Sequence, residues 1–457
     1  MKKNIYILLL IFFNIVHANE SGKTVIAVGE AGVEKMNISF KFAPSYQELI
    51  KSDKEFASSI IKILNNDFSF YKKQFKVLKT KSDLIEKSIN YSSWKTKNFS
   101  YIVSLDLKRI DSTLSLNINV FDIDNEKVLF SMNSFVITDQ LRRVAHNMAN
   151  KIYHSITGKE SIFETRIVFV SDNNEKQKKH IKELYIMDFD GNNVERLTNH
   201  QGLVISPAIS NNQDKVVYSF ISGKNKNRRV NLYLLDLVTK KSSLISTLKG
   251  LNTGAVFMPD DKDILLTLSH TGNAEIFKMN LSTKSLTRVT RHFAPDVDPS
   301  VNHNGNLMTF LSGRAGKAEI YTADPNSIEK NVKRISFVGK FNATPRFSPD
   351  GREIAFSSWL DNRFDIFKIN YDGTGLSRLT KDFGSNEDPT FSNDGNFIAF
   401  SSQRVISKYK AVQNIYIMDV DGEILGKITN NFGNCITPRW SKLSNIGEYA
   451  KNKDTSQ

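Results

Sequence analysis

The chain has 457 residues, a formal net charge of +14 and 40% hydrophobic residues. This length is too great for a single hydrophobic core and fits two domains. The single cysteine, Cys435, excludes an intrachain disulfide, and we interpret it as a small buried hydrophobic residue without a redox role.

The first eighteen residues have the pattern of a secretory signal peptide. Lys2 and Lys3 precede an apolar run from Ile5 to Val16, and small or β-branched residues at Val16 and Ala18 suit cleavage after Ala18. The run is shorter than the roughly 20 residues that a membrane span needs. The alternative is a buried N-terminal helix. We therefore expect a mature chain without a transmembrane segment and, because residue 18 is not Cys, without a lipid anchor.

Residues 19–160 combine strand and helix patterns and predict a small α/β domain. Strand patterns occupy 24–28, 101–105 and 114–120, and a further alternating stretch reaches 135 and completes a hairpin or meander. Ser52-x-x-Glu55 fits a capping box before a helix with an apolar stripe. Thr138 can cap a second helix that stops at Gly158. Residues 67–99 are rich in Lys, Ser and Asn, and we expect them to be partly irregular.

Residues 161–445 repeat one sequence phrase six times. The clearest copies are 344–351 and 388–395, each of which ends in Asp-Gly before an Ile-Ala-Phe strand. Weaker copies are anchored at Pro207, Ala255, Pro299 and Pro438, so the steps between copies are 44 to 49 residues. A period of roughly 40–50 residues made of short strands is typical of β-propeller blades.

The order of strands at the two ends of this region predicts how the ring closes. Each repeat supplies strands A to D, where A carries the Pro-x-Phe-Ser phrase, C an Ile-Tyr pair and D an Arg-Leu-Thr variant. The region begins with a B strand at 166–170 and ends with an A strand at 436–440. We therefore predict an α/β N-terminal domain followed by an all-β six-bladed β-propeller, with residues 446–457 as a polar tail. Closure of this kind removes open sheet edges.

The loops that lead from strand D into strand A are expected at the mouth of the central channel, on the same side as the B–C loops. They carry acidic and polar residues, for which simple turn chemistry is the alternative explanation. The B–C loops near 176–182, 224–229 and 404–410 are basic, which solvation alone also explains. A mixed field of this kind suits the orientation of a protein partner.

Enzymatic and nucleic-acid-binding functions find little support. The chain has no Gly-x-Ser-x-Gly elbow and no His-Glu-x-x-His. Its eight histidines are scattered, and the Asp-x-Asp-Gly triplets at 188–191 and 419–422 lack the downstream Glu of a calcium loop. The basic loops lack interleaved aromatic residues. We predict no catalytic residue, no cofactor, no metal and no nucleic-acid partner.

Over essentially its whole length the sequence resembles the TolB family, the periplasmic propeller proteins of the Tol–Pal system. The resemblance rests on the signal peptide, the length of the α/β domain, the repeats, and the junction Ile156-Thr157-Gly158 followed by 163–167. It implies a non-enzymatic periplasmic scaffold that bridges the lipoprotein Pal and the inner-membrane protein TolA, with a role in outer-membrane integrity and in constriction during cell division. Colicins exploit some members for protein import. Other outer-membrane or periplasmic proteins are further expected partners.

The resemblance also assigns candidate residues to each partner. The Pal-facing candidates at the channel mouth, together with the polar residues beside them, are Leu251, Asp296, Val297, Asp298, Asn342, Thr344, Asn386, Glu387 and Asp388. The TolA-facing segment spans 19–30 and includes Asn19, Glu20, Thr24, Val25 and Ile26. Blade two departs from the family pattern, because Gly254-Ala255 replaces the usual X-Pro. Two alternatives stay open: a secreted propeller enzyme or lectin that binds glycans in the channel, and a basic module that binds anionic lipid or polysaccharide.

Overall fold

The computed structural model describes residues 34–80, 84–86, 88–110, 113–136, 140–173, 181–223, 228–408 and 410–441. The predicted signal peptide, the strand at 24–28, the TolA-facing segment, the cap at Thr138 and the C-terminal tail lie outside these residues. In the described part of the chain, no helix is long and apolar enough to cross a membrane.

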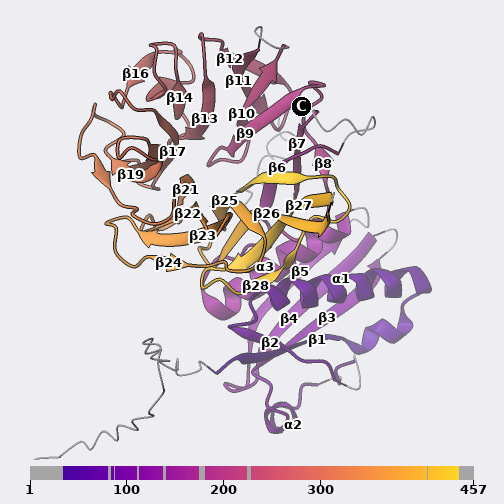
Figure 1. Cartoon of the computed structure of the whole chain (residues 1–457). Helices are drawn as coiled ribbons and strands as arrows, with labels where there is room; N and C mark the ends of the chain where they lie inside the picture. The colour runs from indigo at the N-terminus through magenta and orange to yellow at the C-terminus, as the bar shows by residue number, and fades with distance from the viewer. Residues whose placement is uncertain are drawn as a thin grey trace, which may run out of the picture.

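The first domain is a five-stranded sheet that packs against two long helices (Figure 1). The sheet order is β2-β1-β3-β4-β5, in which β1 runs parallel to β2 and β3 and the other pairs are antiparallel. This confirms the predicted α/β class. The elements are β1 (Met36–Phe42), η1 (Pro44–Glu48), α1 (Lys51–Phe70), β2 (Phe75–Val77), α2 (Tyr91–Thr96), β3 (Tyr101–Ile110), β4 (Thr113–Asp122), β5 (Lys127–Val136) and α3 (Leu141–Thr157).

Helix α1 forms because its apolar residues recur at helical spacing and meet the sheet. Ile60, Leu64 and Phe68 are fully buried, and the Phe68 ring lies 5.2 Å from Phe40 of β1 and 5.1 Å from Phe75 of β2. The predicted capping box was wrong. The helix already begins at Lys51, which places Ser52 inside its first turn, and no side chain caps it.

Helix α3 ends as the sequence predicts. Gly158 adopts φ 69° at the C-cap, and its N–H donates to the carbonyl of His154. A left-handed conformation at this position costs glycine little because it has no Cβ. The chain can therefore turn sharply from α3 toward the first propeller strand.

The second domain is a six-bladed propeller, as predicted. The blades are β9–β12, β13–β16, β17–β20, β21–β24, β25–β28 and the closing blade β29-β6-β7-β8, numbered here one to six. The propeller region begins with β6 (Arg166–Ser171), β7 (Glu183–Asp188), β8 (Glu195–Arg196) and β9 (Leu203–Ile209), and it ends with β29 (Cys435–Trp440). Between them lie β10 (Lys215–Ser222), β11 (Arg229–Asp236), β12 (Ser242–Ser246), β13 (Asn252–Phe257), β14 (Asp263–Leu268), β15 (Glu275–Asn280), β16 (Leu286–Arg288), β17 (Asp296–Val301), β18 (Met308–Ser312), β19 (Glu319–Ala323), β20 (Lys333–Arg334), β21 (Asn342–Phe347), β22 (Glu353–Leu360), β23 (Arg363–Asn370), β24 (Ser377–Arg378), β25 (Ser385–Phe391), β26 (Phe397–Ser407), β27 (Lys410–Asp419) and β28 (Ile424–Lys427).

Ring closure follows the predicted order of strands. Strand β29, from the end of the chain, pairs antiparallel with β6, so that Cys435 lies opposite Ser171 and Trp440 opposite Ile167. The Trp440 indole N–H donates to the Thr165 hydroxyl at 2.8 Å, which ties the two ends of the propeller together. Cys435 is fully buried, and burial raises the pKa of its thiol to about 11, as suits the structural role predicted for it.

Every innermost strand contains a bulge at the same place. The pairing register shifts there in all six blades, and the residue at the shift has a positive φ between 48° and 60°. Five of the six precede a proline, whose ring already restricts the residue before it. The repeated bulge turns the residue at this position of each blade away from the regular pleat. These residues are Ser206, Gly254, Asp298, Thr344, Asp388 and Thr437.

The α/β domain lies against one face of the propeller, at blades five and six (Figure 1). The Tyr71 hydroxyl donates to Asp394 at 2.6 Å and accepts from the Ile162 N–H at 2.9 Å. Lys72 pairs with Glu423 at 2.6 Å. Asp394 and Glu423 belong to the A–B and C–D turns, so we define this side as the turn face. The D–A and B–C loops emerge on the opposite side, which we define as the loop face.

Candidate partner-binding face

The loop face carries the residues predicted for the channel mouth, because each follows a D–A loop. The six A strands contact one another in a ring, which brings these positions around one axis. Leu251 is 37% exposed, and Val297, Thr344 and Glu387 are partly exposed. These four side chains are therefore available to a partner, as are the partly exposed carboxylates of Asp298 and Asp388 described below.

Three other predicted residues have fully buried side chains. The Asn342 amide donates to Glu319 at 2.7 Å, and the Asn386 amide donates to Asp365 at 3.2 Å. Asp296 accepts from the Arg314 guanidinium at 2.6 Å. In this conformation, Asp296, Asn342 and Asn386 hold the propeller together and present no side-chain surface to a partner.

Asn342 and Asn386 belong to a repeated polar clasp that the sequence analysis did not identify. In four blades, a fully buried carboxylate at or near the start of strand C accepts a hydrogen bond from the Thr or Ser hydroxyl just after strand D and forms an ion pair with the Arg of strand D. The Arg-Leu-Thr phrase is thus a structural signature, because burial makes each carboxylate depend on these donors. The four carboxylates are Glu183, Glu275, Glu319 and Asp365.

Two arginines neutralise the carboxylates of the bulge positions. Arg346 donates to Asp298 at 2.9 Å, and Arg439 lies 4.0 Å from Asp388. Each arginine follows the proline of its own A strand and reaches the carboxylate of the preceding blade. The prediction of an acidic mouth was therefore incomplete, since two arginines alternate with two of the predicted carboxylates at blades three to six.

Burial controls the ionisation of this cluster. It raises the pKa of Asp388, although Arg439 and Arg346 act in the opposite direction. It also lowers the pKa of Arg439 to about 10, an effect that the nearby Arg346 reinforces. Glu387 has no cationic partner within the described residues, and burial together with the Asp388 charge raises its pKa to about 7.

The predicted basic B–C loops are only partly described. Lys182, Arg228, Arg229, Arg404, Lys408 and Lys410 fall within the described residues, whereas Lys176, Lys178, Lys179, Lys224 and Lys226 do not. Arg404 donates to the Phe383 carbonyl at 2.9 Å and lies 4.4 Å from the centre of the Phe383 ring. This arginine therefore has a specific structural role beyond solvation.

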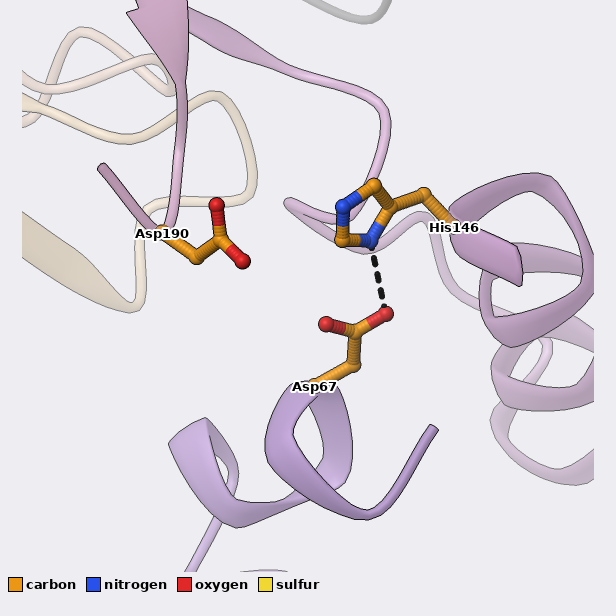
Figure 2. Close-up of side chains that lie close together, drawn as sticks. All are labelled: Asp67, His146 and Asp190. Atoms are coloured by element: carbon orange, nitrogen blue, oxygen red, sulfur yellow. Dashed lines mark hydrogen bonds and ion pairs between the residues drawn. The ribbon is translucent and has the colours of Figure 1, made fainter. Parts of the chain in front are cut away.

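One group of side chains in the described residues has the ligand types of a metal site. Asp67 of α1, His146 of α3 and Asp190 of the β7–β8 turn bring their ligand atoms within 4.8 Å of one another (Figure 2). His146 Nδ1 lies 2.8 Å from Asp67, and Nε2 lies 3.1 Å from the Arg142 guanidinium, which also donates to Asp190. The Arg142 guanidinium thus already supplies a positive charge to this cluster. The cluster joins α1 and α3 to the β7–β8 turn, so it is a contact between the two domains.

The pKa values of Asp67 and His146 at this contact are both raised. Burial raises the pKa of Asp67 to about 6, even though the His146 hydrogen bond opposes the change. Burial lowers the pKa of His146, but the hydrogen bond and charge of Asp67 outweigh it, and the net direction is upward. The cluster was absent from the sequence analysis because its residues are 44 or more positions apart in sequence.

Comparison with known proteins places this architecture in a family. Residues 153–357 match the family model of the TolB beta propeller domain. The Tol-Pal system protein TolB of Francisella tularensis subsp. mediasiatica is 30% identical over 312 residues, which cover 66% of this chain and 69% of the relative. The same protein of F. tularensis subsp. tularensis strain FSC 198 is also 30% identical, over 66% of this chain and 68% of the relative.

A solved structure has the same fold. The crystal structure of TolB from Acinetobacter baumannii aligns with a TM-score of 0.74 and 24% identity, over 90% of this chain and 98% of that one. That overlap extends over both the α/β domain and the propeller. The structure shows the shared fold, and the sequence relatives establish that this chain is a member of the TolB family.

Proposed function

We propose that this protein is a periplasmic, non-enzymatic scaffold of the Tol–Pal system that binds Pal at the loop face of the propeller and TolA through its N-terminal segment. In this role it connects the outer membrane to the inner membrane and supports outer-membrane integrity and constriction at division. The family membership supports a Tol–Pal role, and the partner assignments are our inference from the resemblance and from the geometry.

The observation that carries the proposal is the arrangement of the two faces. The α/β domain covers the turn face at blades five and six, through contacts such as Tyr71 to Asp394. The loop face carries Leu251, Val297, Thr344 and Glu387 with exposed surface and has no covering domain among the described residues. The loop face is therefore open to one partner, and we assign the second partner, TolA, to residues 19–30.

The proposal for the loop face is tested by calorimetric titration of the mature chain with the soluble domain of Pal from the same organism. We expect saturable one-to-one binding at low salt. Leu251→Lys should weaken it, because a charge on an apolar contact must be desolvated on binding. Lys241→Glu, an exposed change next to strand β12, is a control for surface charge as such. Absence of binding by the parent chain would refute the proposed function.

A further inference from the structure

We propose that the loop face of blades three and four carries an aromatic docking patch for an acidic protein surface that bears apolar side chains. The patch consists of Phe293, Phe337, Phe341, Trp359 and Phe364. The inference rests on the proposed function, because the partner to which it commits is the Pal surface that meets this face.

The patch is exposed where a soluble propeller would normally bury such side chains. Phe293 is 88% exposed, Phe337 is 70% exposed and Phe341 is 45% exposed. Phe293 lies in the D–A loop before blade three, and the other two lie in the next D–A loop. Single exposed apolar residues scattered over a surface are normal. Three large aromatic side chains in two consecutive loops of one face are not scattered, and they indicate an interaction site.

The patch has internal order. The Phe341 ring lies 6.1 Å from Phe364, and Phe364 lies 5.0 Å edge-to-face from Trp359. The Arg334 guanidinium sits over the Phe337 ring at 4.2 Å. These contacts hold four of the five rings in place before a partner arrives, so that little side-chain entropy is lost on binding. Rigid aromatic anchors with adjacent arginine are the usual centres of binding energy at protein interfaces.

Charge selects the kind of partner. Arg291 and Lys340 are exposed in the same two D–A loops, and neither side chain forms an ion pair with another described residue. The neighbouring carboxylates are already paired, Asp361 with Arg378 and Glu329 with Arg314. The patch therefore has a local positive field that favours an acidic partner and disfavours a second copy of this chain, whose net charge is +14.

The test compares Pal binding by the parent chain with binding by two variants of the patch. Phe337→Ala/Phe341→Ala removes two anchors, and Lys340→Glu reverses one charge at an exposed position with little effect on folding. Phe135→Ala is the matched control, because Phe135 is 69% exposed on β5 of the other domain. Titration calorimetry gives the affinity of each, and thermal unfolding confirms that each is folded.

We expect the double variant to bind at least 10-fold more weakly and Lys340→Glu several-fold more weakly, with a reduced dependence on salt, while Phe135→Ala binds like the parent. If the parent binds Pal and both patch variants bind equally well, the patch is refuted and the proposed function stands. If the parent itself does not bind Pal, the proposed function and the occupant of the patch are both refuted.

Discussion

Replacement of Glu387 by Gln should stabilise the protein at alkaline pH. Glu387 is a largely buried carboxyl without a cationic partner in the described residues, and burial and Asp388 raise its pKa to about 7 from an ordinary 4.5. The folded state therefore holds the proton more tightly than the unfolded state does. The contribution of this group to stability is fully present below about pH 4.5 and is lost as the pH rises to about 7.

The magnitude follows from the same pKa. The difference between a pKa of about 7 and the ordinary 4.5 corresponds to roughly 3 kcal/mol of unfolding free energy above pH 7, at about 1.4 kcal/mol per pH unit. Partial exposure of the side chain lets water screen the charge, so we expect about 1–2 kcal/mol. Gln keeps the shape and the polar character of the side chain but cannot ionise. The variant should thus be more stable than the parent at pH 8.5 and equally stable at pH 4.5.

Urea unfolding followed by circular dichroism at these two pH values measures the effect. Glu55→Gln is the matched control, because Glu55 lies on the exposed side of α1, away from the propeller. A gain of equal size at both pH values would show that Gln acts through packing. No gain at pH 8.5 would refute the account of a strained buried carboxylate at the mouth.

Three further predictions concern the clasps and the domain contact. Glu319→Ala should destabilise the propeller by about 3–5 kcal/mol, because it leaves Arg334, Ser336 and Asn342 without their buried acceptor; a urea midpoint like that of the parent would contradict this. Asp67 has a pKa raised to about 6, so its contribution to stability is lost as the pH rises through that value. Asp67→Asn should therefore flatten the fall in thermal midpoint between pH 5 and 8, and an unchanged slope would count against the buried pair. Tyr71→Phe removes a hydroxyl that bonds both Asp394 and the Ile162 N–H, and should cost about 1–3 kcal/mol and increase hydrogen exchange at Ile162; protection equal to the parent's would refute its role at the junction.

The propeller can be predicted from the sequence because every blade repeats the same local pattern of turns and buried residues. Every blade needs the same turns and the same alternation of buried residues, so the pattern of one strand, such as Ile354-Ala355-Phe356, recurs along the chain. The closing strand β29 is equally predictable, since the region begins with a B strand and ends with an A strand.

The chemistry of the loop face is less predictable because it depends on contacts between blades. Asn342 and Asp298 both look like exposed polar residues in the sequence, yet one is buried against Glu319 and the other pairs with Arg346 of the next blade. The carboxylate of Glu319 follows a Gly-containing loop and resembles a solvated residue. Its partner Arg334 lies on another strand, and only the three-dimensional pairing shows that they meet.

A pull-down from envelope extract with the mature chain, beside the same chain without residues 19–30, tests most directly whether Pal and TolA bind to separate parts of the protein. We expect both forms to recover Pal and only the longer form to recover TolA. Each partner would then be assigned to its own surface. Recovery of neither partner by the mature chain would contradict the bridging role, and loss of Pal together with TolA in the shortened form would contradict the assignment of the partners to separate surfaces.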